Sequence, residues 1–247
     1  MKLVLENASE FKRMVDAISA LIDEAEFVID ETGVKLKATD PSQISMVDFS
    51  LEKKAFKTFE VEALSKIGLD LDYLSQVMAR AKNSDSLSLE LDEANGRLNV
   101  EFAGNSKRSF AVPLLDVSQQ ELPSPKLEFD AEIEITAGAV QDALKDAALV
   151  SSHISLGVDS SNFFMKASSS KGDWNYSVSK KEGIVHSLEA KKEANSMFPL
   201  DYLQDILKGA SSADKIALCL KSNHPLKLSY SIGSARLTYF LAPRIEG

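Results

Sequence analysis

The sequence has little of the chemistry from which metal sites and disulfide scaffolds are built. It contains one cysteine and three histidines in 247 residues. A single cysteine excludes an internal disulfide, and Cys219 lies in the apolar run 216–220, which favours an inert thiol in a reducing, cytoplasmic setting. His153, His186 and His224 stand far apart, without another ligand at metal-binding spacing. We therefore predict neither a metal nor a cofactor.

Long hydrophobic runs and glycine clusters are also missing. No apolar segment approaches the ~20 residues that span a bilayer, and residues 1–6 alternate like a strand rather than following a signal-peptide layout. The 11 glycines form no phosphate-binding loop, and the common hydrolase, zinc-protease and nucleotide-binding motifs are absent. Neighbouring carboxylates such as Asp92 and Glu93 fit turns and solvated faces. An enzyme is the weaker hypothesis, although a duplicated-domain hydrolase with a site assembled from distant residues stays open.

Positive charge is in the minority. The chain has 28 Lys and Arg against 37 Asp and Glu, a net charge of −9, which argues against a protein that simply coats nucleic acid. A local basic surface is still compatible with an acidic exterior. A hydrophobic content of 44% and a charged content of 26% are typical of a globular protein, and the length allows two modest domains.

What the sequence does contain is an internal repeat. The segment 71–80, LDYLSQVMAR, returns as 200–208, LDYLQDILK, at an offset of 129 residues (200 − 71). The same offset pairs the alternating residues Leu87, Leu89 and Leu91 with Ile216, Leu218 and Leu220, and it pairs Asp30 with Asp159. An offset one residue longer pairs 110–113 with 240–243. Several matches in one order indicate a tandem duplication.

Hydrophobic spacing predicts the elements of the first copy. A strand at Leu3 and Leu5 leads to a helix capped by Asn7, whose core positions are Phe11, Met14, Val15, Ile18 and Ile22. Strands follow over 27–30, 34–38, 44–51 and 56–62, with a turn at Gly33. A second helix, with Asp72 as N-cap, precedes strands over 87–91, 98–102 and 109–114, with a hairpin turn at Asn95 and Gly96.

The second copy is expected to repeat this plan. A strand over 129–135, a helix capped by Thr136, strands between 154 and 189, a helix capped by Asp201 and three final strands complete it. Between the copies, residues 116–126 contain two prolines and no periodicity, which is typical of an extended connection. Leu122 stands out as an apolar residue there; it either packs on the core or binds a partner.

The whole chain resembles the DNA sliding clamps of the proliferating cell nuclear antigen family. The resemblance is carried by the segments 21–25 (LIDEA), 33–36 (GVKL), 40–47 (DPSQISMV), 68–71 (GLDL), 110–116 (FAVPLLD) and 237–246 (LTYFLAPRIE). The ending just after Leu-Ala-Pro is similar to the archaeal type of clamp. The duplication found from the residues alone is what such a clamp requires.

The resemblance implies an α+β fold, with a β-α-β-β-β-α-β-β-β domain used twice per chain: domain 1 over 1–116, a connector over 117–127 and domain 2 over 128–247. Three subunits would form a ring with sheets outside and helices lining a hole around duplex DNA. The implied function is that of a processivity factor, loaded by an ATP-driven clamp loader, that tethers DNA polymerase and other replication and repair enzymes. It would work as a homotrimer in the cytoplasm, at the nucleoid. The alternative is a subunit that assembles only with paralogues.

Cations on the helices are the DNA-contacting candidates that the resemblance implies. Lysine and arginine at these positions would meet phosphate without reading bases, so that the ring can slide. The candidates are Lys12, Arg13, Arg80, Lys82, Lys107, Lys145 and Lys208. Acids on the same helices, Asp16, Asp142 and Asp205, make this lining less basic than that of a DNA-coating protein.

The resemblance also implies a pocket for partner peptides. Family partners carry a short motif with a glutamine, an aliphatic residue and two aromatics, which fills an apolar cavity beneath the connector. The corresponding residues are Gln43, Ile44, Met46, Leu122, Pro123, Pro225, Phe240, Leu241, Ala242 and Pro243. Taken alone, Ile44 and Met46 would be read as ordinary core residues.

Ring closure is the third implied contact. In the family, strands of one subunit pair with strands of the next, which removes exposed sheet edges. The interface candidates are Arg80, Lys82, Arg108, Phe110, Asp142 and Asp146, and we expect ion pairs across the interface among the charged ones.

Overall fold

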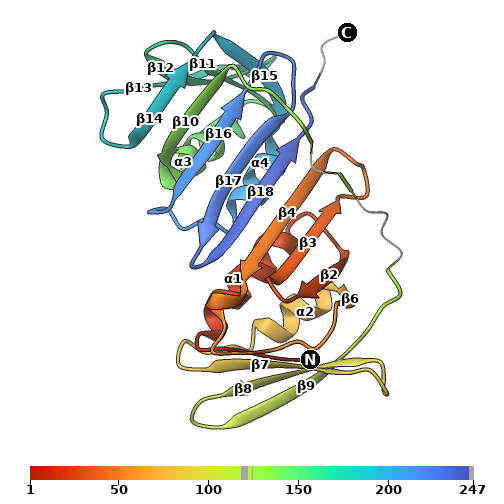
Figure 1. Ribbon diagram of the computed structural model, residues 1–247. Coiled ribbons are helices and arrows are strands. Elements are labelled where there is room, and N and C mark those ends of the chain that lie inside the picture. The colour runs from red at the N-terminus through yellow and green to blue at the C-terminus, as the bar shows by residue number, and fades with distance from the viewer. Residues whose placement is uncertain (118–121, 124, 245–247) are drawn as a thin grey trace. The chain divides into compact units, whose positions relative to one another are not determined.

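The computed structural model describes residues 1–117, 122–123 and 125–244 (Figure 1). The chain divides into two compact units, the first made of Met1–Pro41, Val47–Pro123 and Ile232–Leu237 and the second of the remainder. The middle of the predicted connector and the C-terminal residues from Ile245 lie outside the described part. The predicted domain bounds at 116, 117, 127 and 128 stay a prediction.

The first copy of the repeat runs from β1 to β9. Its elements are β1 (Lys2–Leu5), α1 (Ala8–Ser19), β2 (Glu24–Asp30), β3 (Gly33–Thr39), β4 (Ser45–Glu52), a 3-10 turn η1 (Lys53–Ala55), β5 (Thr58–Glu60), β6 (Ser65–Asp70), α2 (Leu71–Met78), β7 (Ser86–Asp92), β8 (Arg97–Ala103) and β9 (Lys107–Pro113).

The second copy runs from β10 to β18. Its elements are β10 (Ala131–Thr136), α3 (Ala137–Ala147), β11 (His153–Val158), β12 (Asn162–Ser169), β13 (Gly172–Ser179), β14 (Val185–Ala190), β15 (Ala194–Pro199), α4 (Leu200–Leu207), β16 (Lys215–Leu220), β17 (Leu226–Ile232) and β18 (Ala235–Leu241).

Strand order confirms the duplication and the α+β class. The first copy has the order β5-β1-β7-β8-β9 and the second β14-β10-β16-β17-β18. Likewise β4-β3-β2-β6 corresponds to β13-β12-β11-β15. Each copy has five strands between its helices, two more than the expected pattern of three. The additions are a strand paired to the first strand of the copy (β5, β14) and a strand that runs directly into the second helix (β6, β15).

Helix α1 begins as the sequence predicts, whereas two other predicted caps are wrong. The Asn7 side chain accepts hydrogen bonds from the amides of Ser9 and Glu10 at 3.0 and 3.3 Å. The N-cap of α2 is Asp70, which accepts from the Tyr73 amide at 2.8 Å, so Asp72 lies in the first turn. Because β6 and β15 run without a break into their helices, the helices begin earlier than the aspartates suggested.

The second copy caps its helices less completely. The N-cap of α4 is Pro199, without a side-chain hydrogen bond, and the predicted cap Asp201 lies in the first turn. Thr136 does occupy the N-cap of α3, again without a side-chain bond. An acidic residue in the first turn still favours a helix, since it meets the positive end of the helix dipole.

The helices present buried stripes to the strands of their own unit. Ile18 of α1 and Leu74 of α2 are 1% exposed, and Leu144 of α3 is equally buried. Ile22, predicted as a core position of the first helix, is buried but lies beyond the end of α1. Within each unit the two helices pack together, α1 with α2 and α3 with α4. This packing holds the polar faces of a helix pair next to each other.

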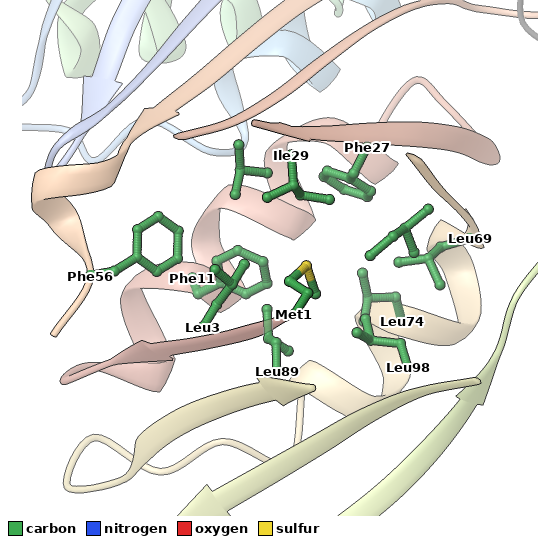
Figure 2. A pocket seen from close by; sticks show the side chains of 12 residues that line it. Met1, Leu3, Phe11, Phe27, Ile29, Phe56, Leu69, Leu74, Leu89 and Leu98 are labelled. Atoms are coloured by element: carbon green, nitrogen blue, oxygen red, sulfur yellow. The ribbon is translucent and has the colours of Figure 1, made fainter. Parts of the chain in front are cut away.

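The core of the first unit is not completely filled. A cavity of about 30 Å³ is lined by apolar side chains from β1, α1, β2, α2 and the strands around them. Figure 2 shows Phe11, Leu74, Leu89 and Leu98 around it. With no polar group in its lining, the cavity offers a water molecule no hydrogen-bond partner.

Candidate functional site

The polar face of the α1–α2 pair carries two of the predicted DNA-facing cations. Lys12 is half-buried and forms an ion pair with Asp16, one turn further along α1. The other carboxylate oxygen of Asp16 accepts from Ser75 Oγ of α2 at 2.9 Å, so the acid joins the two helices. Arg13 is exposed on the same helix.

The α3–α4 pair carries the other two helix lysines. Lys145 Nζ lies 2.8 Å from Asp142 Oδ1, and Lys208 Nζ lies 2.6 Å from Asp205 Oδ1. Between the helices is an open trough of about 430 Å³, lined by Gln141, Leu144, Lys145, Asp201, Gln204, Asp205, Leu207 and Lys208. Gln141 donates to the backbone oxygens of Leu207 and Ala210, both at 2.9 Å, and so satisfies carbonyls at the end of α4.

Three further candidates lie outside these helices. Arg80 and Lys82 follow α2 and are exposed. Lys107 is the first residue of β9 and pairs with Glu101 of β8 at 3.2 Å. Lys107 therefore belongs to a sheet hairpin, not to a helix face.

Arg108, predicted to pair across the subunit interface, has an ion-pair partner within its own unit. Its guanidinium pairs with Asp85, whose side chain is 3% exposed, and it donates to the backbone oxygen of Arg80 at 2.6 Å. It also lies over the ring of Phe102, 5.4 Å from the centroid. Arg108 thus ties the end of α2 to β9. The sequence did not indicate Asp85, since 23 residues separate the two partners.

The remaining interface candidates are exposed or half-exposed. Asp142 and Asp146 are exposed on α3, and Phe110 of β9 packs edge-on against Phe102 at 6.0 Å. Leu149, just after α3, is 76% exposed, although it was not a predicted site residue. An apolar residue outside a helical stripe is the signal that would have identified it.

Two of the strands that end their sheets carry an interface candidate or aromatic side chains. Strand β9 ends the order of its sheet, and β13 ends another. Strand β13 carries Trp174, the only tryptophan, stacked on Tyr176 with centroids 6.2 Å apart. The sequence indicates no interface at β13, because a short alternating strand does not reveal whether it lies at an edge.

The predicted peptide-pocket residues of the second unit come from two distant stretches of sequence. The amide of Ala242 donates to the backbone oxygen of Ile44 at 2.9 Å, which joins the segment 42–46 to the end of the chain. Gln43 has a φ of 56°, in the left-handed region, and Ile44 is 36% exposed. Met46 and Leu241 are buried and support this surface from below.

The other predicted pocket residues differ in burial and belong to both units. Phe240, Ala242, Pro243 and Pro225 are half-buried in the second unit. Leu122 is half-buried and Pro123 is exposed, and both belong to the first unit. The connector residues next to them lie outside the described part.

Arg244 fixes the end of the described chain. Its amide donates to the backbone oxygen of Met197 in β15 at 2.8 Å, and its guanidinium lies 3.1 Å from His153 Nδ1. Partial burial, together with the nearby charge of Arg244, lowers the pKa of His153, while Asp201 opposes the shift. At neutral pH His153 is therefore uncharged and does not repel Arg244.

A buried tyrosine pair holds β18 under this surface. Tyr230 donates to the backbone oxygen of Ile206 in α4 at 2.8 Å, and its hydroxyl lies 3.3 Å from that of Tyr239. Burial raises the pKa of Tyr239 well above its ordinary value. The Tyr239 hydroxyl therefore stays protonated and takes part in a neutral hydrogen bond with Tyr230.

The described residues contain no group of histidine, cysteine, aspartate or glutamate side chains arranged to hold a metal ion. The longest described helix has 12 residues, and no helix in this part of the chain is long and apolar enough to cross a membrane.

Comparison with known proteins covers the full chain. The family model for the N-terminal domain of proliferating cell nuclear antigen matches residues 1–122, and that for the C-terminal domain matches 124–245. The DNA polymerase sliding clamp of Methanococcus vannielii is 39% identical over 246 residues, which cover 97% of each chain.

Solved structures agree. PCNA from Thermococcus kodakaraensis matches with a TM-score of 0.95 at 28% identity, over 98% of this chain and 99% of that one. PCNA of A. fulgidus, solved with the C-terminal region of FEN-1 bound, matches with a TM-score of 0.89 at 28% identity, over 100% of this chain and 99% of that one. A chain of the PCNA2–PCNA3 complex of Sulfolobus tokodaii matches with a TM-score of 0.91 at 25% identity, over the full length of both chains. With both domain models matched and the duplicated fold in place, this chain belongs to the proliferating cell nuclear antigen family.

Proposed function

We propose that this protein is a sliding clamp: a non-enzymatic ring that encircles duplex DNA and tethers DNA polymerase and other replication and repair proteins. The observation that carries the proposal is the full-length match to proteins named DNA polymerase sliding clamps, joined to a fold in which each copy packs two helices together. We assign it to the cytoplasm, at the nucleoid.

The DNA contact is made by the polar faces of the helix pairs. Their cations meet phosphates and make no base contacts, so binding is independent of sequence and falls with salt. The variant Lys12→Ala/Lys145→Ala/Lys208→Ala tests this role. We expect weaker binding to a labelled duplex and a shallower dependence of log K on log[salt]. Unchanged binding by a folded variant would remove these lysines from the DNA surface.

The partner-peptide site is formed by the segment 42–46 and the end of β18 with residues 242–243. The exposed Ile44 side chain, the half-buried Ala242 and the supporting Met46 present an apolar surface beside an extended backbone. A structural relative holds the C-terminal region of FEN-1, which is consistent with this kind of ligand.

Binding of a fluorescent peptide with a glutamine, an aliphatic residue and two aromatics tests this site. We expect Ile44→Glu to weaken binding at least tenfold, about 1.4 kcal/mol, whereas the matched surface change Leu64→Glu leaves it unchanged. Equal binding by both variants would refute the assignment.

Assembly into a ring uses the edge strands β9 and β13, with Asp146 and the exposed Leu149 close to the end of α3. Pairing these edges between subunits would satisfy backbone groups and remove two open edges. Light scattering tests the state: a homotrimer has three times the mass of the 27.0 kDa chain. Asp146→Arg should loosen the ring, and an Asp146→Arg variant that stays trimeric at low concentration would contradict the predicted ion pairs.

A second candidate is a subunit that assembles only with paralogues. The match to a complex of two different PCNA chains favours it. A chain that stays monomeric at all concentrations in the light-scattering series would support this alternative, with the fold and peptide site unchanged.

A further inference from the structure

Three of the proposed DNA-facing lysines share one arrangement, in which each holds a carboxylate of its own helix. The pairs are Lys12 with Asp16, Lys145 with Asp142 and Lys208 with Asp205. The partners stand three or four residues apart, which places them on one face of the helix. The positive charge is therefore offset at the place where phosphate is expected to bind.

The two copies reach this arrangement with charges at exchanged positions. At the offset of the repeat, Asp16 corresponds to Lys145, and Arg13 corresponds to Asp142. The pairs are therefore not left over from one ancestral position of the duplicated helix. Each of these helices balances its charge with its own set of residues, so the balance itself is what the copies share.

The three pairs differ in exposure: the Asp142–Lys145 pair opens easily, whereas Asp16 and Asp205 are only 35% and 31% exposed. Lys145 and Asp142 are 71% and 77% exposed, so water and salt compete with their contact. The Asp16 side chain is 35% exposed and is also bound by Ser75. Asp16 is therefore fixed beside Lys12, whereas Asp142 can turn away.

The trough between α3 and α4 shows how the acids would oppose a phosphate. Lys145 and Lys208 both line it, as do Asp201 and Asp205. A phosphate that enters meets two ammonium groups together with two carboxylates. The lysines hold it fully only when their own aspartates give way.

We propose that Asp16, Asp142 and Asp205 limit the strength of the DNA contact, a role that rests on the proposed function of these helices. Each lysine exchanges a carboxylate for a phosphate and back again as the duplex moves past. A lysine that is already neutralised releases fewer counterions on binding, so the contact is weaker and less dependent on salt. Weak, exchangeable contacts suit a ring that must move along DNA.

The test is the binding of the full-length protein to a labelled duplex, measured by fluorescence anisotropy between about 50 and 200 mM salt. We expect the D16N/D142N/D205N variant, compared at the assembly state of wild type by light scattering because Asp142 is also an interface candidate, to bind about tenfold more tightly, which corresponds to about 1.4 kcal/mol. The plot of log K against log[salt] should steepen by about 0.9 for each lysine that gains a phosphate. The D142N/D205N variant, which keeps the Asp16–Ser75 bond, should give an intermediate result.

A matched control separates local from overall charge. Glu62, Glu182 and Glu193 are exposed and lie in loops outside the helices, and their replacement by glutamine removes the same number of negative charges. If this control gains as much affinity as the aspartate variant, net charge explains the effect and the proposal is wrong. The proposal also fails if the lysine-to-alanine variant loses affinity while the aspartate variant matches wild type. If neither the lysine nor the aspartate variant changes binding, the DNA-facing role of the helices fails as well.

Discussion

The carboxylate of Asp85 is a buried charged group of the first unit whose removal should cost substantial stability. It accepts from the Lys82 amide at 2.8 Å and pairs with Arg108, which in turn binds the backbone oxygen of Arg80. Asp85→Ala leaves both the amide and the guanidinium without their acceptor. The link between the end of α2 and β9 is then held by a single hydrogen bond.

The magnitude follows from burial. Breaking a fully buried ion pair costs about 3–5 kcal/mol, and a buried donor left unpaired costs about 1–3 kcal/mol. The Asp85 side chain is 3% exposed, but that of Arg108 is 27% exposed and recovers part of its hydration. We expect Asp85→Ala to lower the free energy of unfolding by about 3 kcal/mol. Glu101→Ala removes the partner of Lys107 from the same hairpin, where both side chains are exposed, and should cost at most about 0.5 kcal/mol.

Urea unfolding at one fixed chain concentration measures both variants, because assembly adds to apparent stability. Circular dichroism follows the whole chain, whereas Trp174 fluorescence reports the second unit alone. The loss of unfolding free energy caused by Asp85→Ala should therefore be larger when measured by circular dichroism than when measured by Trp174 fluorescence. A double-mutant cycle with Arg108→Ala should show coupling above about 1 kcal/mol. Equal losses for Asp85→Ala and Glu101→Ala, or additive changes in the cycle, would refute the reasoning.

Three further predictions concern the core, acid stability and the start of the connector. Leu98→Ala enlarges the cavity of the first unit and should cost about 3–5 kcal/mol in urea unfolding, against a change within about 0.5 kcal/mol for the exposed Leu64→Ala. Hydrogen bonds from Lys35 and Thr32 hold the pKa of Asp30 below its usual range. A lowered pKa adds stability above the unfolded value of about 3.9 that is lost as pH falls, so wild type and Asp30→Asn should converge in acid. Gly68→Val places a Cβ 2.2 Å from the Leu115 oxygen, so amide exchange at Leu115 should accelerate; Gly183→Ala, with open space around it, should leave it unchanged.

The internal repeat made the duplicated fold predictable from the sequence. Individual strands and helix starts were less predictable, because some local patterns fit more than one structure. The LDYL segments and the alternating leucines identified two equivalent copies, which the strand orders confirm. Strand β6 was missed because Ile67, Gly68 and Leu69 are buried in succession, so it lacks alternation. The cap of α2 was misplaced because Asp70 and Asp72 are both suitable residues. The backbone alone decides between them.

The candidate site was predictable where function depends on one helix. Lys12, Lys145 and Lys208 lie on or at the end of helices, and each aspartate beside them was visible as a helical neighbour. Contacts between distant segments were not predictable in this way. No local pattern places Ile44 beside Ala242, and only the family resemblance suggested it. The Arg108–Asp85 pair has no periodic signal in the sequence, and the interface role that the family resemblance implies for Arg108 stays a prediction.

The duplication also explains which sheet edges are covered. Leu115 forms a bridge to Gly68 of β6, and Arg244 forms a bridge to Met197 of β15. These two bridges are equivalent at the offset of the repeat, since 129 residues separate Gly68 from Met197 and Leu115 from Arg244. In each copy, the segment that follows the last strand therefore covers the edge of the strand that leads into the second helix. Such a cover blocks pairing with another chain at β6 and β15. The other strands that end their sheets, β5, β9, β13 and β14, have no bridge of this kind among the described residues. Of these four we assign ring closure to β9, which carries the interface candidates Arg108 and Phe110, and to β13, which carries the stacked Trp174 and Tyr176.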